Sequence, residues 1–133
     1  MDNLTVEQRR KNMRNIRSKN TQPERIVFQE LRKRDLYFTK HVANVPGKPD
    51  IVFKRKKVAI FIDSDFWHGN PSRFQMPRTN TDYWEKKISS NKKRDRRVTS
   101  ELVGRGWLVV RLWEYEVRHN IDECMRTIEK AIV

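Results

Sequence analysis

The stretch from residue 45 to residue 68, VPGKPDIVFKRKKVAIFIDSDFWH, constrains the fold more than any other part of the chain. Two short apolar runs, residues 51–53 and 58–62, flank a basic turn, which is the pattern of a β-hairpin. Such a hairpin brings Asp50, at the start of its first strand, close to Asp63, at the end of its second strand. Two carboxylates that converge beside a basic surface suit a Mg²⁺ ion, which takes few protein oxygens and keeps positions for water and phosphate. A structural salt bridge to the surrounding Lys and Arg side chains is the alternative interpretation.

The charge of the chain points to a polyanionic partner. Its 133 residues include 30 Lys and Arg against 17 Asp and Glu, which gives a formal net charge of +13. This excess favours nucleic acid, with a ribosomal or generic basic protein as the plainer alternative. The single cysteine, Cys124, excludes an internal disulfide, and no apolar run approaches the roughly 20 residues of a membrane span. Because the N-terminus also lacks an apolar signal segment, we expect a cytoplasmic protein.

Apolar spacing and capping signals predict eight elements in the order helix, helix, strand, strand, strand, helix, strand, helix. Their approximate bounds are helix 6–17, helix 21–33, strand 36–38, strand 51–53, strand 58–62, helix 82–103, strand 107–113 and helix 121–132. This order predicts a three-layer α/β domain with a small mixed sheet. We expect residues 1–20 to form a basic N-terminal arm that lies on DNA, with a frayed terminus as the alternative, and residues 21–133 to form one domain.

Several side chains near the hairpin have both a chemical and a structural interpretation. Glu24 completes a capping box with Thr21, so a catalytic role needs more than local sequence. His68 follows the converging acids, where an imidazole can take a proton from water or give one to a leaving oxygen, whereas an ordinary histidine is the alternative. Phe66 and Trp67 are adjacent, so at least one should face solvent and could unstack base pairs; core packing is the alternative.

In combination, these segments resemble the very short patch repair (Vsr) endonucleases, which nick DNA beside a T:G mismatch. The similarity covers nearly the whole chain, and the order and spacing of the segments make it specific. The segments are KNMRNIRSKNT at 11–21, Glu24, PGKPDIVF at 46–53, FWHG at 66–69, TDYWEKKISSNKKRDRR at 81–97 and GWLVVRLWE at 106–114. The resemblance implies a restriction-endonuclease-like fold, which is a three-layer α/β/α arrangement with a small mixed central sheet, and a Mg²⁺ cofactor.

The resemblance also implies roles for individual residues. Asp50 corresponds to the main Mg²⁺ ligand, and Ile62 to a position whose main-chain carbonyl binds the metal. His68 corresponds to the catalytic histidine, and Glu24 to an acid that orients the attacking water or that histidine. The expected DNA contacts are Met13 and Arg14 of the arm, the intercalating aromatics Phe66, Trp67 and Trp84, and the basic helix residues Lys92, Lys93 and Arg96.

Two departures from the family pattern affect these expectations. Family members commonly carry a structural zinc, but the corresponding positions here are Asp65, Asn70, Ser72 and Tyr115, so we expect no structural zinc. Where some members have a second histidine, this chain has Asp63, which we expect to act as a further catalytic acid and Mg²⁺ ligand. This second departure leaves the mismatch chemistry open.

We therefore expect a Mg²⁺-dependent endonuclease that nicks double-stranded DNA at a T:G mismatch. It should act as a monomer at the bacterial nucleoid, alongside a cytosine methyltransferase or mismatch-repair proteins. A restriction endonuclease that cuts both strands of a matched site is one alternative. A protein that binds distorted duplex without cutting it is another.

Overall fold

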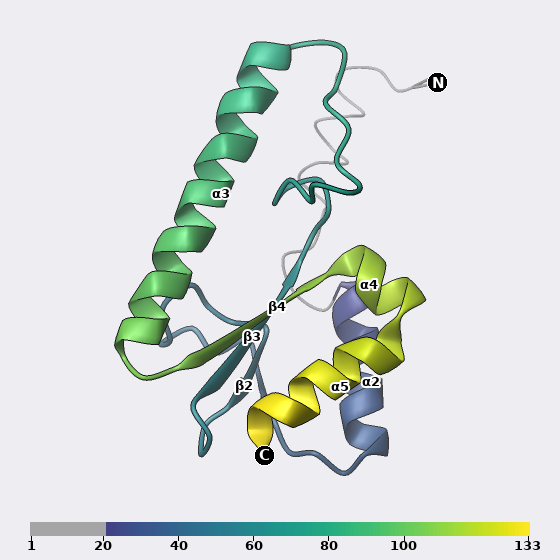
Figure 1. The fold of residues 1–133 in the computed structure, drawn as a ribbon, viewed down its shortest axis with the longest axis vertical. Helices are drawn as coiled ribbons and strands as arrows, with labels where there is room; N and C mark the ends of the chain where they lie inside the picture. The colour runs from purple at the N-terminus through teal and green to yellow at the C-terminus, as the bar shows by residue number, and fades with distance from the viewer. Residues whose placement is uncertain (1–20) are drawn as a thin grey trace.

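The computed structural model describes residues 21–133, so the predicted helix 6–17 and the DNA contacts Met13 and Arg14 lie outside the described residues. The described part contains four helices and four strands (Figure 1). In chain order the elements are α2 (Gln22–Lys33), β1 (Thr39–Lys40), β2 (Ile51–Phe53), β3 (Val58–Asp63), α3 (Thr81–Gly104), β4 (Leu108–Trp113), α4 (Glu114–His119) and α5 (Ile121–Ile132). None of the described helices combines the length and apolar character that a bilayer crossing requires.

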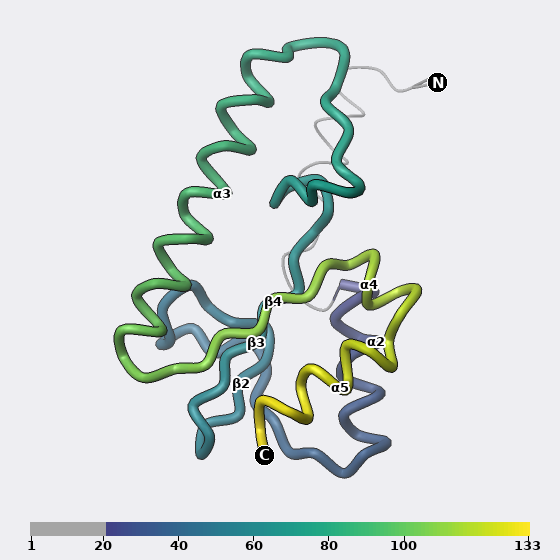
Figure 2. The backbone as a smooth tube through the Cα atoms, in the orientation of Figure 1, coloured from purple at the N-terminus to yellow at the C-terminus, as the bar shows by residue number. Residues whose placement is uncertain are grey.

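The four strands form one mixed sheet in the order β1-β2-β3-β4. β1 and β3 are antiparallel to β2, whereas β4 runs parallel to β3. Helices α2, α4 and α5 pack against one another on one face of this sheet, and α3 packs on the other (Figures 1 and 2). The result is the predicted three-layer α/β/α arrangement with a small mixed sheet.

Strand β3 joins the two hydrophobic cores because successive side chains of a strand point to opposite faces. Val58 and Ile60 belong to the larger core, under α2 and α5. Ala59 and Phe61 belong to the smaller core, under α3. A strand that is apolar on both faces is typical of a buried strand with a parallel neighbour. The end of β3 is therefore held rigidly between layers, which fixes the position of the residues that follow it.

After β3 the chain runs beside α3 before it enters that helix. Figures 1 and 2 show this segment rising from the sheet and α3 returning to β4. The side-chain amide of Asn91 donates to the carbonyl of Trp67 at 2.8 Å. Gly69 has φ +62°, and a Cβ there would lie 2.4 Å from Cε of Lys92. The positive φ favours glycine at this position, and the hydrogen bond from Asn91 joins the segment 64–70 to α3.

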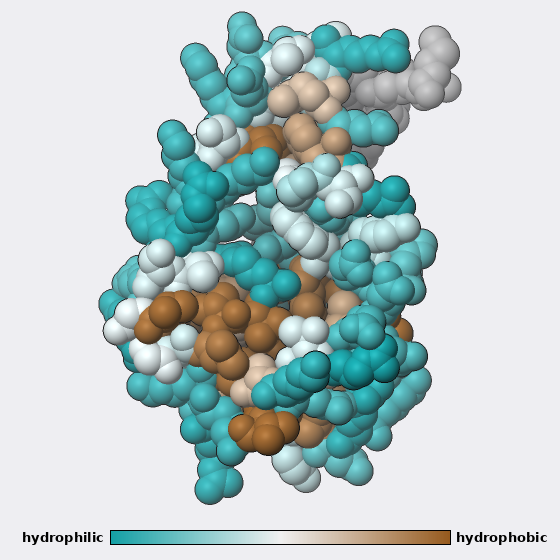
Figure 3. Space-filling view, in the orientation of Figure 1, coloured by the Kyte–Doolittle hydropathy of each residue, from teal (hydrophilic) through white to brown (hydrophobic). Residues whose placement is uncertain are grey.

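The hydropathy of the surface differs between the two ends of the molecule. On the face shown in Figure 3, hydrophilic residues dominate α3 and the segment opposite it, whereas hydrophobic surface gathers where β4 crosses the sheet. Leu108 of β4 and Val103 of α3 are 50 % and 57 % exposed. The hydrophilic part of this face includes α3, the helix that carries Trp84, Lys92, Lys93 and Arg96, which were expected to contact DNA.

The sequence predictions of α2, β2, β3, α3, β4 and α5 are confirmed to within about two residues. The short strand predicted before the hairpin is present, but β1 pairs through Thr39–Lys40 and not through 36–38; Leu36 and Phe38 pack on the larger core from the segment after α2. Helix α4 was not predicted. It is six residues long and buries Val117 alone, so it has no apolar repeat of its own.

Replacing Ile60 by Ala should lower the free energy of unfolding by about 2–5 kcal/mol, because this 0 % exposed side chain would leave a cavity between sheet and helices. Urea denaturation followed by circular dichroism measures the change. Val103→Ala is the control, with an expected change of about 0.5 kcal/mol or less because Val103 is exposed. Equal losses at the two positions would contradict this description of the core.

Candidate active site

An open cleft of about 630 Å³ lies where the end of β3 meets the start of β2 and the N-terminus of α2. Six residues that the sequence predicted for the site line it: Glu24, Asp50, Ile62, Asp63, Trp67 and His68. They come from α2, from both strands of the hairpin and from the segment after β3. The fold therefore gathers residues that lie more than forty positions apart in the chain.

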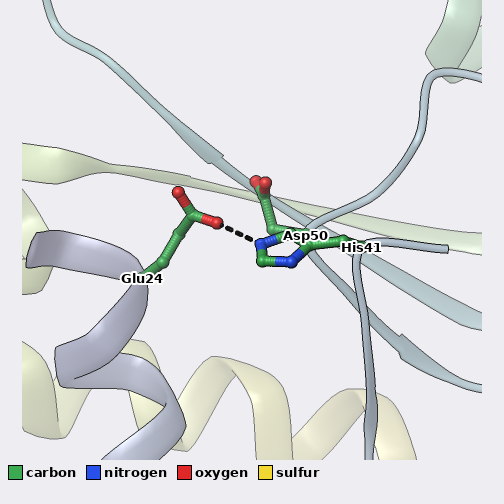
Figure 4. A group of neighbouring side chains, drawn as sticks. All are labelled: Glu24, His41 and Asp50. Carbon is green, nitrogen blue, oxygen red and sulfur yellow. Dashed lines mark hydrogen bonds and ion pairs between the residues drawn. The ribbon is translucent and has the colours of Figure 1, made fainter. Parts of the chain in front are cut away.

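Glu24, His41 and Asp50 form a first group, which we call the Asp50 cluster (Figure 4). One ligand atom of each lies within 4.8 Å of the others. Glu24 is 3 % exposed, and its Oε1 lies 2.7 Å from Nε2 of His41. Its Oε2 accepts hydrogen bonds from the main-chain N–H and the hydroxyl of Thr21, at 3.2 and 2.6 Å. The same carboxylate thus caps α2 and faces the cleft.

Asp50 is held against β3 by its own carboxylate. Its Oδ2 accepts a hydrogen bond from the main-chain N–H of Ile62 at 2.7 Å. Burial is the main cause that raises the pKa of Asp50 to about 7; the hydrogen bond from Ile62 lowers this pKa, and the negative charges of Glu24 and Asp63 raise it. Burial and the neighbouring acids therefore favour the protonated form of Asp50 over its charged form.

The donor set of the Asp50 cluster fits a divalent metal ion. It offers carboxylate oxygens and an imidazole, with the main chain of Ile62 next to Asp50. Within residues 21–133, no Lys or Arg nitrogen lies within 4.0 Å of a carboxylate oxygen of Glu24 or Asp50. A hard cation such as Mg²⁺ takes oxygen ligands of this kind and would offset their repulsion.

Asp63, His68 and Asp95 form a second group, the Asp63 cluster, which also contains Arg111. Nδ1 of His68 lies 2.6 Å from Oδ2 of Asp95 and 3.8 Å from Oδ1 of Asp63. Because an ionised carboxylate only accepts hydrogen bonds, this contact suits the tautomer that carries its proton on Nδ1 and leaves a lone pair on Nε2. Nη1 of Arg111 donates to both oxygens of Asp63, at 3.1 and 3.2 Å.

Burial and the contacts of Asp63 change the pKa of its carboxyl group in opposite directions. Burial raises the pKa of Asp63, whereas His68 and Arg111 lower it; Asp95 raises it. Asp63 is 5 % exposed, so an unpaired negative charge would be costly there. The guanidinium of Arg111 is therefore the main fixed counter-charge of this cluster.

The structure brings the predicted acids into one cleft but divides them between two clusters. Asp50 and Asp63 are close enough for the charge of Asp63 to raise the pKa of Asp50, yet each has its own partners. Glu24 pairs with His41 rather than with His68. The acid that contacts His68 is Asp95.

Sequence reasoning missed three members of these clusters, His41, Asp95 and Arg111. Asp95 carries a signal that could have found it, because it is the one acid in the basic run KKRDRR at 92–97. His41 and Arg111 carry none, since each has an ordinary neighbourhood in the sequence. Their roles depend on which distant residues pack beside them.

The predicted aromatics form one cluster between α3 and the segment after β3. Phe66 lies 5.1 Å from Trp67 and 5.3 Å from Trp84 between ring centroids, and Trp67 lies 5.7 Å from Trp84. Phe74 and Tyr83 extend the cluster at 5.6 and 5.0 Å from Phe66 and Trp84, respectively. Phe66, Trp67 and Trp84 are half-buried, so their rings pack on one another and still reach the surface.

The predicted basic contacts lie on α3. Lys93 and Arg96 are exposed, whereas Lys92 is half-buried, with its Cε beside Gly69. All three lie on the helix that carries Asp95, so cations follow the surface next to the Asp63 cluster.

Hydrogen bonds and aromatic contacts involve the four positions at which the resemblance implied no zinc ligand, Asp65, Asn70, Ser72 and Tyr115. The side-chain amide of Asn70 donates to Oδ1 of Asp65 at 2.9 Å, and its carbonyl accepts from the N–H of Ser72 at 3.1 Å. Asn70 is 5 % exposed. The guanidinium of Arg73 lies 3.6 Å from the ring centroid of Tyr115. These contacts close the turn that follows His68.

Without divalent metal, the free energy of unfolding should fall as the pH rises through the pKa of Asp50. The folded protein holds this proton more tightly than the unfolded chain, so the stabilising contribution is complete below the ordinary pKa of 3.8 and is lost as the pH rises through about 7. Urea denaturation in EDTA, from about pH 4 to about pH 8, should show that Asp50→Asn removes much of this decline.

Asp35→Asn is the control for this measurement. Asp35 is exposed, lies outside the cleft and has φ +56°, which Asn tolerates. We expect its pH profile to match that of the wild type. Parallel profiles for wild type and Asp50→Asn would contradict the raised pKa.

Comparisons with known proteins agree with this site and fold. The model of the family "DNA mismatch endonuclease Vsr" matches residues 1–73. The Type II nicking enzyme V.NmeDIP of Neisseria meningitidis serogroup C is 38% identical over 134 residues, which covers 99% of this chain and 90% of that protein. The DNA mismatch endonuclease Vsr of Escherichia coli (strain K12) is 38% identical over 111 residues, which covers 83% of this chain and 71% of that protein.

A solved structure shows the same fold at low sequence identity. The catalytic domain of the homing endonuclease I-Bth0305I superposes with a TM-score of 0.57 and 22% identity, covering 84% of this chain and 94% of that domain. The three-layer fold is thus restriction-endonuclease-like, as the sequence predicted. The extent of the family match and the identity to full-length relatives lead to one conclusion: the chain belongs to the Vsr family of DNA mismatch endonucleases and is an endonuclease that acts on DNA.

Proposed function

We propose that the protein is a Mg²⁺-dependent endonuclease that nicks one strand of duplex DNA at a T:G mismatch. The observation that carries this proposal is the pairing, in one cleft, of a carboxylate cluster that has no Lys or Arg partner among residues 21–133 and a histidine–aspartate pair. The names of its relatives, a mismatch endonuclease and nicking enzymes, support the choice of substrate and of a single-strand cut.

Asp50 would be the main metal ligand, with the main-chain carbonyl of Ile62 as the second. The hydrogen bond from the N–H of Ile62 to Asp50 keeps these two residues together. Glu24 lies in the same cluster and adds negative charge without a Lys or Arg partner among residues 21–133. When bound there, Mg²⁺ would polarise the scissile phosphate and stabilise the charge that develops on the leaving oxygen.

His68 would accept the proton of the attacking water. Its Nδ1–H is directed to Asp95, which fixes the ring and leaves Nε2 as the base. Asp95 would act as a positioning residue, because its carboxylate contacts His68 and lies 3.9 Å from Nη1 of Arg111. Such an orienting carboxylate holds the productive tautomer of a histidine base.

The aromatic cluster would select distorted DNA. Phe66, Trp67 and Trp84 reach the surface beside the cleft, where they could enter the base stack. Unstacking costs a few kcal/mol per step and costs least at a mismatched base pair, which favours a T:G site over matched DNA. Lys92, Lys93 and Arg96, with Met13 and Arg14 of the arm, would contact the backbone and the groove.

The cellular setting follows from the same proposal. T:G pairs arise when a methylated cytosine loses its amino group, so the enzyme would work beside a cytosine methyltransferase or mismatch-repair proteins. It would act as a monomer, because a nick needs one active site. Its place would be the nucleoid, in the cytoplasm.

Cleavage of end-labelled duplexes that differ at a single T:G pair tests the proposal. We expect a nick in one strand of the mismatched duplex with Mg²⁺ and no cleavage in EDTA. Asp50→Ala should abolish the nick, and His68→Ala should slow it about 10²- to 10⁴-fold because the general base is lost. Lys130→Ala, exposed on α5 outside the cleft, is the control and should cleave like the wild type.

Other outcomes would replace the proposal. Cleavage of both strands of matched duplex would favour a restriction endonuclease. Binding of mismatched duplex by fluorescence anisotropy, with no cut in several sequence contexts, would favour a protein that binds distorted DNA without cutting it.

A further inference from the structure

All three guanidinium nitrogens of Arg111 donate hydrogen bonds within or beside the Asp63 cluster. Its Nη1 donates to both carboxylate oxygens of Asp63, its Nε donates to Oγ1 of Thr99 at 3.0 Å, and its Nη2 donates to the main-chain carbonyl of Asp95 at 3.3 Å. The guanidinium carbon also lies 4.2 Å from the ring centroid of Phe61. A guanidinium with this many contacts has little freedom to leave.

The two carboxylate clusters of the cleft therefore differ in whether an arginine lies beside the acids. In the Asp63 cluster, Nη1 of Arg111 lies 3.1 Å from Asp63 and 3.9 Å from Asp95. In the Asp50 cluster, His41 is the one basic side chain among residues 21–133 with a nitrogen within 4.0 Å of a carboxylate oxygen. Both clusters have the residue types of a metal site, but one of them already contains a permanent positive charge.

A divalent ion in the Asp63 cluster would have to undo existing contacts. To bind Asp63 it would compete with the guanidinium for a carboxylate whose two oxygens both already accept from Nη1. To bind His68 through Nδ1 it would need the nitrogen whose proton is directed to Asp95 at 2.6 Å. Two cations at this spacing would also repel each other strongly in a partly buried site.

We propose that Arg111 is the built-in cation of the Asp63 cluster, so that this cluster takes no divalent ion and the cleft binds metal at Asp50 alone. Asp63 is then a positioning residue that anchors Arg111 and flanks His68, in place of the metal ligand expected from the sequence. The assignment of the single metal to Asp50 rests on the proposed function, whereas the exclusion of metal from the Asp63 cluster rests on the contacts of Arg111.

Calorimetric titration of the EDTA-treated full chain with Mn²⁺ alone tests the inference, because it counts bound ions without DNA or cleavage. We expect one equivalent in the wild type, none in Asp50→Asn and one in Asp63→Asn. Arg111→Met, which keeps the length of the side chain but removes its charge, should bind one additional equivalent. That additional ion should be lost again in the double variant Arg111→Met/Asp63→Asn.

Arg118→Met is the matched control, because Arg118 also lines the cleft but contacts Gln22 and Glu114 instead of Asp63. It should bind one equivalent, like the wild type. Circular dichroism checks that each variant is folded; if Arg111→Met is not, the Asp63→Asn titration still decides the question.

The outcomes separate this inference from the proposed function. A wild-type ion that is lost in Asp63→Asn overturns the inference, as does a folded Arg111→Met that binds no additional ion. A wild type that binds no Mn²⁺, together with an Arg111→Met variant that binds one, would overturn the metal site at Asp50 and support the role of Arg111.

Discussion

The carboxylates that meet at the end of β3 impose the main physical constraint on this molecule. Glu24 and Asp63 are buried, and Asp50 and Asp95 are half-buried beside them. Negative charges in a partly buried site are stable only with positive partners or protons. The two clusters differ in their positive partners. Arg111 donates to Asp63 and lowers its pKa, whereas burial, with the charges of Glu24 and Asp63, raises the pKa of Asp50 to about 7. Because no Lys or Arg among residues 21–133 pairs with its acids, the Asp50 cluster fits a divalent metal ion.

The topology of the sheet determines where the residues of both carboxylate clusters lie. The antiparallel β2–β3 hairpin places Asp50 beside Ile62, and the parallel pairing of β3 with β4 places Arg111 opposite Phe61. Since side chains two positions apart share a face of a strand, Arg111 reaches both the ring of Phe61 and the carboxylate of Asp63. Helix α3 completes the arrangement with Asp95 and Thr99. The layers that make the fold stable are therefore the layers that set the charges of the cleft.

The sequence predicted the hairpin, the long helix and the last helix because their apolar patterns are local and regular. It did not predict α4, whose single buried residue gives no repeat, or the position of β1, which pairs through two residues. The partners within the clusters were missed for a related reason. His41 lies 17 positions from Glu24, Asp95 27 positions from His68, and Arg111 48 positions from Asp63. Such pairs depend on tertiary packing, which local patterns do not encode.

One cleft holds two carboxylate clusters, of which one would bind metal and the other contains Arg111 as its own cation. Anomalous scattering from a Mn²⁺-soaked crystal tests it most directly, because the peak positions locate each ion. We predict one peak, about 2.1–2.2 Å from the carboxylate of Asp50, with Arg111 still bound to Asp63. A peak bonded to Asp63, with the guanidinium of Arg111 displaced, would contradict the account.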